Sequence, residues 1–388
     1  MNKKILLGLV GLSLINNTQA SSPCKDSLSV LSWNIDTNIV RTEGGYARDA
    51  FPEFRVNARM PFIKETLGRI ISSSSPDVIH IQEGRHFITT FGDEVDSITP
   101  VMDFLKSQGY QVFEKQYNPT DLAFSYITAI KKGFVVDDLE GLYFTKTPEA
   151  PTDHSLPIQD VKDNNFGEEW ERCAFSVKFH DKCGRNYVAT NVHLGISEQH
   201  RKEACRMLRQ NAEARACQDS NLLEVITGDF NTFPLWGGPA QLKIMAENDT
   251  LQEVTADLRL ENGKRSSSTF IAFPYDFAAN EKRLNDASVA ETGVPLAKRL
   301  SALPVDERKK EIRRLYATEC KAIGDQLDRV YQRGFDNAAV TLLLASKDGC
   351  FNPDDFNEDA VKEVVLCTNG PAFASDHQPL LTTLSIPE

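Results

Sequence analysis

The sequence predicts an α/β protein in which helices cover a mixed β-sheet. Short apolar runs of strand length alternate along the chain with segments of helical periodicity. Two of the apolar runs flank the turn-like stretch HDKCGR, which is typical of a β-hairpin, so some neighbouring strands should be antiparallel. The chain has 388 residues, 41% of them hydrophobic and 25% charged, which is ordinary globular composition and enough for a sizeable core.

The predicted strands are apolar runs that stop at polar residues or turn signals. In chain order they comprise residues 29–35, 77–83, 125–130, 134–136, 173–179, 186–194, 222–230, 325–334 and 377–386. The predicted helices have apolar residues at helical spacing and comprise residues 59–71, 99–108 and 199–217. The break SSSSP separates the first of these helices from the strand that follows it.

The N-terminus has the pattern of a secretory signal peptide. Two lysines precede an apolar run at residues 5–15, and a polar stretch then ends on the small residue Ala20. The apolar run is too short to span a bilayer. We therefore expect residues 1–20 to be removed and the mature chain, residues 21–388, to be exported to the periplasm or the medium. The alternative interpretation is an uncleaved anchor or a buried N-terminal helix.

The cysteines agree with export. An even number of them follows the predicted cleavage point, which favours disulfides in an oxidising compartment. They are Cys24, Cys173, Cys183, Cys205, Cys217, Cys320, Cys350 and Cys367. The sequence does not choose among their pairings, although Cys205 and Cys217 share one predicted helix and lie too far apart to bond. No CxxC spacing occurs, which argues against a structural zinc site.

The net charge of −12 argues against binding nucleic acid by broad electrostatic attraction. A local basic cleft or a bound cation can still invert the field at a site. A cluster of carboxylates that holds a divalent metal ion would suit this charge balance.

Polar side chains that can do chemistry recur where the predicted strands end. They are Asn34, Glu83, His193, Asp229, Asn231, Asp328, Asp376 and His377. Each of them alone also fits a structural role as a turn residue, a helix cap or a buried core histidine. Their recurrence favours one shared site, because ligand sites form where the edges of packed sheets meet.

These residues lie in six segments that resemble the motifs of the endonuclease/exonuclease/phosphatase superfamily of metal-dependent phosphohydrolases. The segments are LSWNID (31–36), PDVIHIQEGR (76–85), TNVHLG (190–195), TGDFNTFP (227–234), QLDRVY (326–331) and ASDHQPLL (374–381). They occur in the order of the family and span the chain from about residue 28 to its end. The resemblance implies a DNase I-like fold, a four-layer α/β/β/α sandwich of two packed mixed β-sheets forming one domain after the signal peptide.

The resemblance also implies a ligand set for Mg²⁺ or Mn²⁺ and one substrate contact. Glu83 matches the metal-binding glutamate of the family, Asn34 the asparagine that helps to hold metal or phosphate, and Asp376 the second metal-linked carboxylate. Arg85 lies where the pancreatic-type deoxyribonucleases place a substrate-contacting arginine. Hard carboxylate oxygens suit a cation that neutralises phosphate charge.

The catalytic roles carried over by the resemblance fall on five residues. Asp229 and Asn231 match the pair that orients the attacking water and a phosphate oxygen. His193 and His377 match the two histidines that flank the scissile phosphate, and imidazoles suit proton transfer or donation to phosphate oxygens. Asp328 matches the carboxylate that orients a histidine, which fixes the tautomer of that ring.

Residues 278–325 do not match the core pattern. They are charged and include the stretch ERKKEIRR at 307–314, and we interpret them as an inserted helical segment. A solvated helix face is the favoured interpretation, because charge runs usually form one, and a lid or substrate-facing arm is the alternative.

The sequence therefore predicts an exported, metal-dependent phosphodiesterase that acts through activated water on a phosphodiester substrate. A nuclease acting on DNA or RNA is the first hypothesis, and a secreted lipid phosphodiesterase or phosphatase, resembling sphingomyelinases or phosphoinositide phosphatases, is the alternative. A binding module that has lost catalysis is a third hypothesis. It is disfavoured because none of Glu83, His193, Asp229, Asn231 or His377 is missing. The sequence does not predict the oligomeric state.

Overall fold

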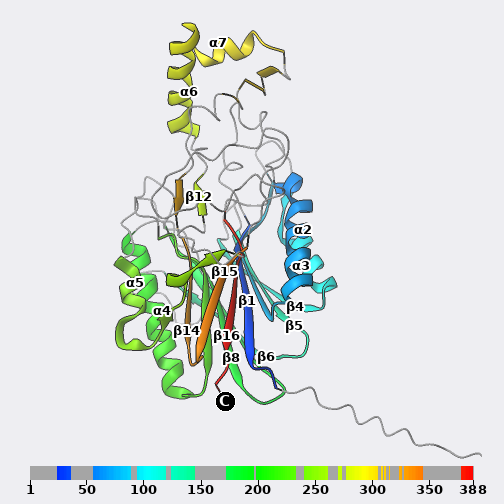
Figure 1. Cartoon of the computed structure of the whole chain (residues 1–388), viewed down its shortest axis with the longest axis vertical. Coiled ribbons are helices and arrows are strands. Elements are labelled where there is room, and N and C mark those ends of the chain that lie inside the picture. Colours follow the sequence, from blue (N-terminus) through cyan, green and yellow to red (C-terminus); the bar gives the residue numbers. More distant parts are fainter. Residues whose placement is uncertain are drawn as a thin grey trace, which may run out of the picture.

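The computed structural model describes most of the two sheets and the helices around them. The described residues are 24–35, 56–88, 94–118, 124–144, 172–195, 198–232, 240–260, 270–272, 277–304, 307–308, 310–311, 314, 323–325, 327–343 and 377–387. Figure 1 shows two sheets packed against each other, with helices α2 and α3 on one side and α4 and α5 on the other. The predicted signal peptide and Asp376 lie outside the described residues.

The larger sheet has eight strands in the order β11-β15-β16-β1-β2-β5-β4, with β3 paired to β2. Its strands are β1 (Ser27–Asn34), β2 (Val78–Ile88), β3 (Glu94–Asp96), β4 (Tyr110–Asn118), β5 (Phe124–Lys131), β11 (Arg259–Leu260), β15 (Asn337–Leu342) and β16 (Leu380–Ser385). The sheet is mixed, because β1 and β2 are parallel whereas β1 and β16 are antiparallel.

The second sheet has six strands in the order β10-β14-β9-β8-β7-β6. Its strands are β6 (Val135–Tyr143), β7 (Cys173–His180), β8 (Asn186–His193), β9 (Leu223–Asp229), β10 (Gln252–Glu253) and β14 (Asp328–Arg333). The hairpin predicted around HDKCGR is confirmed as β7–β8, which pair antiparallel. The next pair, β8 and β9, is parallel, so this sheet is mixed as well.

Helices cover the outer face of each sheet. They are α2 (Val56–Ser74), α3 (Ile98–Ser107), α4 (Glu198–Gln218) and α5 (Ala240–Met245). On α2, Ile63, Leu67 and Ile70 are buried against the larger sheet, as the helical spacing of the sequence predicts. On α4, Leu208 and Ala212 are buried against the smaller sheet, so each sheet has its own outer core.

The central core lies between the two sheets and contains apolar and polar layers. Aromatic and branched residues from both sheets fill most of it, among them Phe124, Tyr126, Phe175 and Val225. Toward one end of the sheets, buried polar groups bond across the gap, and His80 Nδ1 lies 2.7 Å from Thr227 Oγ1. The prediction of a two-sheet α/β sandwich is therefore confirmed.

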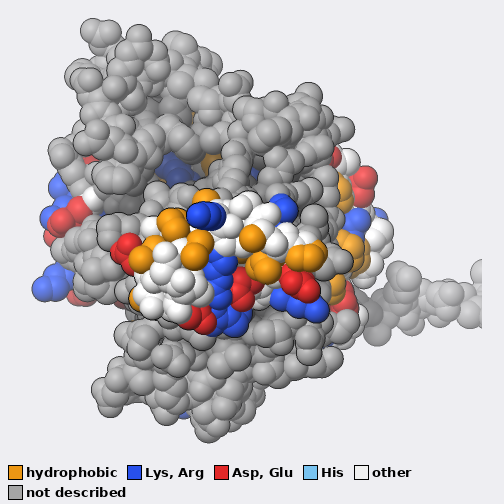
Figure 2. Space-filling model, turned by 90° about the horizontal axis from the view of Figure 1, so that it is seen from above, with side chains coloured by type: hydrophobic (Ala, Val, Ile, Leu, Met, Phe, Trp, Pro, Cys, Tyr) orange, Lys and Arg blue, Asp and Glu red, His pale blue; other side chains and the backbone are white. Residues whose placement is uncertain are grey.

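Helices α6 (Phe277–Thr292) and α7 (Leu296–Ser301) lie beyond one end of the sandwich (Figure 1). Apart from Phe277, both helices belong to the predicted insertion 278–325. Strands β12 (Phe270–Ala272) and β13 (Ile323–Asp325) pair antiparallel, so the chain leaves and returns side by side. Arg299 Nη1 lies 2.8 Å from Glu291, and Arg314 Nη2 lies 2.6 Å from the same carboxylate. Figure 2 shows acidic, basic and apolar side chains mixed on the described part of this end.

A disulfide joins Cys24 to Cys183 and links the start of β1 to the β7–β8 turn, across a sequence separation of 159 residues. Arg185 in that turn donates a hydrogen bond to the carbonyl of Lys25 at 2.7 Å, which reinforces the same connection. Cys205 and Cys217 both lie on α4, as predicted. None of the helices in the described part of the chain combines the length and the apolar character that a bilayer crossing requires.

Candidate active site

The strand directions bring the predicted site residues to one edge of the sandwich. Strand β1 ends at Asn34, which pairs with Gln82 of parallel β2, so Glu83 lies beside the end of β1. Strand β2 itself continues to Ile88, beyond the end at Glu83 that the sequence predicts. Parallel β8 and β9 end with His193 opposite Asp229. Strand β14 is antiparallel to β9, so its first residue, Asp328, lies opposite Asp229. For the same reason His377 reaches this edge just before β16, which is antiparallel to β1. One topological pattern therefore explains why six distant motifs converge.

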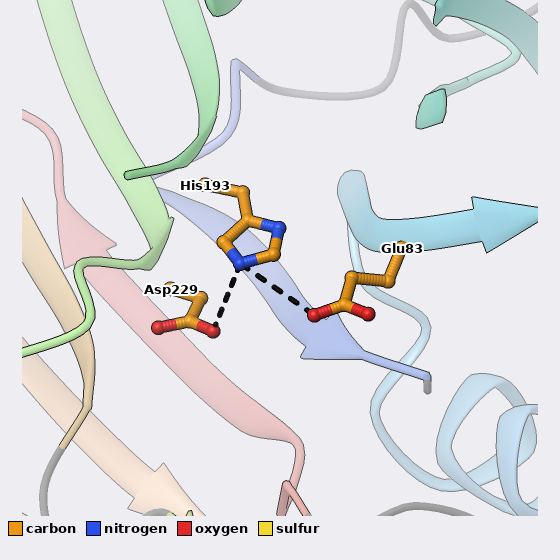
Figure 3. Close-up of side chains that lie close together, drawn as sticks. All are labelled: Glu83, His193 and Asp229. Atoms are coloured by element: carbon orange, nitrogen blue, oxygen red, sulfur yellow. Dashed lines mark ion pairs between the residues drawn. The ribbon is translucent and has the colours of Figure 1, made fainter. Parts of the chain in front are cut away.

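Glu83, His193 and Asp229 form the centre of the site. One ligand atom from each lies within 4.8 Å of the others, and all three side chains are buried. His193 Nε2 lies 3.5 Å from Glu83 Oε1 and 3.4 Å from Asp229 Oδ2 (Figure 3). The two carboxylates come from different sheets, so the site spans the seam between the sheets.

Asn34 links the two carboxylates. Its Nδ2 donates hydrogen bonds to Glu83 Oε1 at 3.1 Å and to Asp229 Oδ2 at 3.2 Å. Two carboxylates and a carboxamide offer hard oxygen ligands, the type that Mg²⁺ and Mn²⁺ prefer. The chemistry of this donor set therefore fits the predicted metal ion, although Asp376, the third predicted ligand, lies outside the described residues.

Glu83 adopts a left-handed backbone conformation, with φ of 57°. The pairing of β2 with β5 shifts register between Ile81 and Gly84, so Glu83 lies in an irregularity of the strand rather than in its regular pleat. Such a conformation costs a glutamate about 1–2 kcal/mol. Strain of this kind is typical of functional sites, where the fold holds a side chain in a required direction.

The Asp229 carboxyl has an unusual environment. Burial raises its pKa to about 6, and the neighbouring carboxylates of Asp328 and Glu83 act in the same direction. His377 and the backbone N–H of Asn231 oppose this shift. Carboxyl groups with a pKa near neutrality are common at catalytic centres, where they exchange protons at the working pH.

The end of β9 requires a glycine, and the turn after it places Asn231. Gly228 has φ of 144°, and a Cβ at this position would lie 2.0 Å from the carbonyl oxygen of Val192 on the neighbouring strand. Asn231 has φ of 50°, and its backbone N–H donates to Asp229 Oδ1 at 2.8 Å. Its side-chain Nδ2 donates to the Leu194 carbonyl at 2.6 Å. An amide NH2 carries two hydrogens, so this bond does not preclude a contact with phosphate.

His377 is held by two contacts on opposite sides. Its Nδ1 lies 2.8 Å from Asp328 Oδ2, and its backbone carbonyl accepts a hydrogen bond from Trp33 Nε1 at 3.0 Å. Its Nε2 faces Asp229 Oδ2 at 3.6 Å. The structure therefore brings Asp328 and His377 together with Asp229, as the resemblance implies.

Arg85 lies beside Glu83, with Nη2 3.4 Å from Glu83 Oε2. Its guanidinium stacks over the Phe124 ring at 4.3 Å, and the residue is only 2% exposed. In this position Arg85 supports the Glu83 carboxylate. The contact with substrate stays a prediction.

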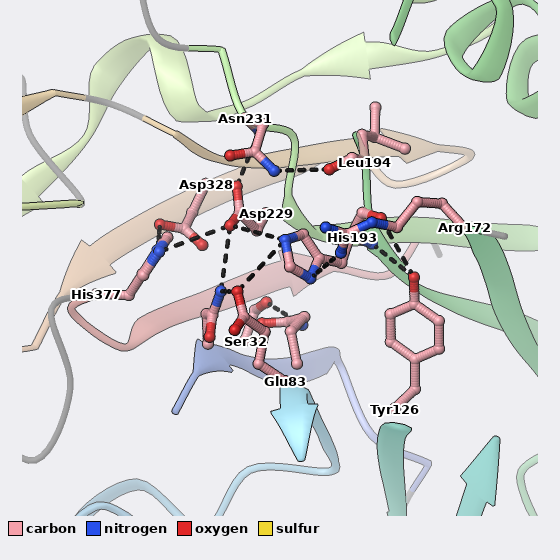
Figure 4. Close-up of polar contacts among 12 residues, drawn as sticks. Ser32, Glu83, Tyr126, Arg172, His193, Leu194, Asp229, Asn231, Asp328 and His377 are labelled. Carbon is pink, nitrogen blue, oxygen red and sulfur yellow. Dashed lines mark hydrogen bonds and ion pairs between the residues drawn. The ribbon is translucent and has the colours of Figure 1, made fainter. Parts of the chain in front are cut away.

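Two further residues contact the site although no role in it was predicted for them from the sequence. Arg172 immediately precedes β7, and its Nη1 lies 2.7 Å from His193 Nδ1 (Figure 4). Tyr126 on β5 accepts a hydrogen bond from the backbone N–H of His193 at 3.0 Å and donates to the Cys173 carbonyl at 2.6 Å. The hairpin register carries a signal for Arg172, because pairing Ala174 with Val192 places it near His193.

Comparison with solved structures supports one fold. The chain is similar to truncated TDP2 of Caenorhabditis elegans, with a TM-score of 0.51 and 14% sequence identity over 92% of this chain and 97% of that one. An endonuclease/exonuclease/phosphatase of Bacteroides vulgatus matches with a TM-score of 0.51 and 15% identity over 94% of this chain and all of that one. The fold is DNase I-like.

A third similar structure is the mannosyl-6-phosphatase Bt3783 of Bacteroides thetaiotaomicron, with a TM-score of 0.53 and 14% identity over 93% of this chain and all of that one. No family model matches the chain, and no curated protein matches it. The resemblance that the six motifs indicate is thus confirmed in the fold.

Proposed function

We propose that this chain is a metal-dependent phosphodiesterase of the endonuclease/exonuclease/phosphatase family, and that its substrate is a nucleic acid. The observation that carries the proposal is the single buried cluster in which Glu83 and Asp229 from two sheets surround His193. A second imidazole, that of His377, is held next to Asp229 by the carboxylate of Asp328. Negative ligands for a cation and two imidazoles in one place are what hydrolysis of a phosphate ester requires.

The ligands of the metal ion in this proposal are Glu83 and Asn34, with the predicted ligand Asp376. When bound, Mg²⁺ or Mn²⁺ neutralises charge on the non-bridging phosphate oxygens. Asn34 contacts both Glu83 and Asp229, so its amide fixes the position of the two carboxylates relative to each other before a ligand binds. Arg85 lies against the outer oxygen of Glu83 and limits its rotation.

The remaining residues act on water and on the phosphate. Asp229 orients the attacking water, and a pKa raised by burial toward neutrality suits a group that takes a proton from it. Asn231 is fixed beside Asp229 by the turn after β9 and binds a phosphate oxygen. Asp328 holds His377 by Nδ1, so Nε2 faces the reacting groups.

A nucleic acid substrate is favoured by one neighbour and by the expected location. A TDP2 of Danio rerio with a TM-score of 0.50 was solved in complex with a single-strand DNA product. An exported enzyme of this type would act on extracellular nucleic acid. Export is supported by the N-terminal pattern and by the disulfide between Cys24 and Cys183.

The decisive experiment is nicking of plasmid DNA by purified residues 21–388 in Mg²⁺ or Mn²⁺. We expect nicking that disappears with EDTA and with His193→Ala. His180→Ala is the matched control. His180 lies at the end of β7 that is remote from the site, and its ring contacts Asp137. If the folded, metal-loaded protein neither nicks DNA nor cleaves RNA, the proposal that its substrate is a nucleic acid is wrong. Sphingomyelin, phosphoinositides and a phosphomonoester complete the panel and test the lipid and monoesterase alternatives.

A further inference from the structure

His193 and Arg172 form a contact that determines where the imidazole carries its proton. Arg172 Nη1 lies 2.7 Å from His193 Nδ1, and both residues are buried. A guanidinium has five N–H donors and no acceptor, and it stays protonated at any pH the protein meets. Nδ1 must therefore be the acceptor and cannot carry a hydrogen in this arrangement.

The opposite ring nitrogen has the complementary surroundings. His193 Nε2 faces two acceptors, Glu83 Oε1 at 3.5 Å and Asp229 Oδ2 at 3.4 Å. A neutral imidazole has one N–H and one lone pair. Because Arg172 uses the lone pair on Nδ1, the hydrogen lies on Nε2, directed toward the centre of the site.

Both partners of this contact are tied to the scaffold. The Tyr126 hydroxyl accepts from the backbone N–H of His193 and donates to the carbonyl of Cys173, the residue after Arg172. The Arg172 carbonyl in turn accepts a hydrogen bond from the Phe144 N–H at 3.0 Å. The backbones that carry the guanidinium and the imidazole are thus fixed relative to each other.

We propose that Arg172 is a positioning residue that holds His193 as the Nε2–H tautomer, so that this imidazole serves as a hydrogen-bond donor to the substrate phosphate and neither as a metal ligand nor as a base. The inference rests on the proposed function for the identity of the acceptor. A nitrogen that carries a hydrogen has no lone pair for a cation, so His193 is excluded from the ligand set although its Nε2 lies in the same cluster as Glu83 and Asp229. The metal ligands are then oxygens only.

The first test reads the tautomer directly and needs no substrate. Nitrogen-15 NMR of uniformly labelled residues 21–388 distinguishes a ring nitrogen that carries hydrogen from one that does not, and the spectrum of His193→Gln assigns the resonances among the seven histidines. We expect His193 to carry hydrogen on Nε2 only, before and after addition of Mg²⁺. A hydrogen on Nδ1 of the wild-type ring, or loss of the Nε2 hydrogen when Mg²⁺ is added, would overturn the proposal.

Arg172→Lys and Arg172→Met form the matched pair for the same measurement. Lysine keeps a charged donor of similar reach, whereas methionine keeps the apolar stem and removes the donor. We expect the wild-type nitrogen pattern in Arg172→Lys and a hydrogen on Nδ1 in Arg172→Met. An Arg172→Met protein that is folded by circular dichroism and keeps the wild-type pattern would show that Arg172 does not set the tautomer.

The second test asks whether His193 acts as a donor. Glutamine can place an N–H close to the position of Nε2, whereas methionine of similar size has none. We expect His193→Met to lose about 10²-fold or more in kcat, the usual cost of removing one donor to a developing oxyanion, and His193→Gln to recover part of that loss. Equal kcat values for the two variants would contradict the donor role. Because the NMR result does not depend on turnover, failure of the proposed substrate and failure of the tautomer assignment can be told apart.

Discussion

Asp328 and His377 form a buried carboxylate–imidazole pair, with 2.8 Å between Asp328 Oδ2 and His377 Nδ1. An ionised carboxylate has no hydrogen to donate, so Nδ1 of this ring carries the hydrogen. His193 has the reverse arrangement, because its Nδ1 faces the Arg172 guanidinium. The two histidines of the site are therefore held as opposite tautomers, His377 with its hydrogen on Nδ1 and His193 with its hydrogen on Nε2. Of the two, only His377 presents a ring nitrogen without hydrogen toward Asp229.

We expect Asp328→Asn to lower kcat by about 10²-fold, because an amide neither fixes the tautomer of His377 nor stabilises its cation. Asp137→Asn is the matched control, since Asp137 contacts the Nδ1 of the half-buried His180 at 2.9 Å, at the end of β7 opposite to Arg172. The measurement is initial rates on a phosphodiester substrate for both variants and the parent. Equal rates for Asp328→Asn and the parent would contradict the role of this pair.

The metal ligands make a separate prediction about stability. A ligand that binds only the folded state raises Tm by mass action. If Mg²⁺ binds at the proposed site, this increase should require the Glu83 carboxylate. Glu83→Gln keeps the side-chain volume and removes the charge, so we expect its Tm to be unchanged by millimolar Mg²⁺ while the Tm of the parent rises. Glu203→Gln on α4 is the control, because Glu203 pairs with Arg206 on the helix surface. Scanning calorimetry with Mg²⁺ and with EDTA measures both, and a Tm of Glu83→Gln that rises as in the parent would exclude Glu83 as a ligand.

Residues of the candidate site could be named from the sequence, but the contacts between them could not be predicted from it. Glu83, Asp229 and His377 could be named because each follows or precedes an apolar run, and strand ends meet at sheet edges. Which ends meet depends on the parallel pairing of β1 with β2 and of β8 with β9. Strand periodicity does not encode that pairing, so it came from the family resemblance and from the structure.

Arg172 shows why the role of a residue in the site was missed. An arginine just before a strand does not by itself indicate a function. Its contact with His193 becomes visible only when the hairpin register places the two residues side by side. The disulfide partners Cys24 and Cys183 could not be chosen for the same reason, because they are 159 residues apart and meet only in the assembled sandwich. Long-range contacts of this kind follow from the whole topology, not from local patterns.

His80 makes a prediction about acid stability. Burial lowers the pKa of this ring to about 3 from its ordinary value of 6.5, so the folded state holds it neutral while the unfolded state takes up a proton. The stabilisation is complete above pH 6.5 and is lost as the pH falls toward 3, at about 1.4 kcal/mol per pH unit. His80→Asn keeps a group that can bond Thr227 but does not titrate. We expect urea unfolding to show that the parent loses about 2 kcal/mol more than His80→Asn between pH 6.5 and pH 5, and parallel losses would contradict a neutral buried ring.

The disulfide makes the last prediction. In the chain-entropy model, a cross-link between residues 159 apart stabilises a fold by about 5 kcal/mol at most, because it restricts the unfolded chain. We expect Cys24→Ser, or reduction with dithiothreitol, to lower Tm by several degrees, since the bond also ties the start of β1 to the β7–β8 turn. Cys217→Ser is the control, because Cys217 is exposed on α4. If Cys24→Ser melts at the same temperature as Cys217→Ser, the disulfide does not stabilise the sandwich.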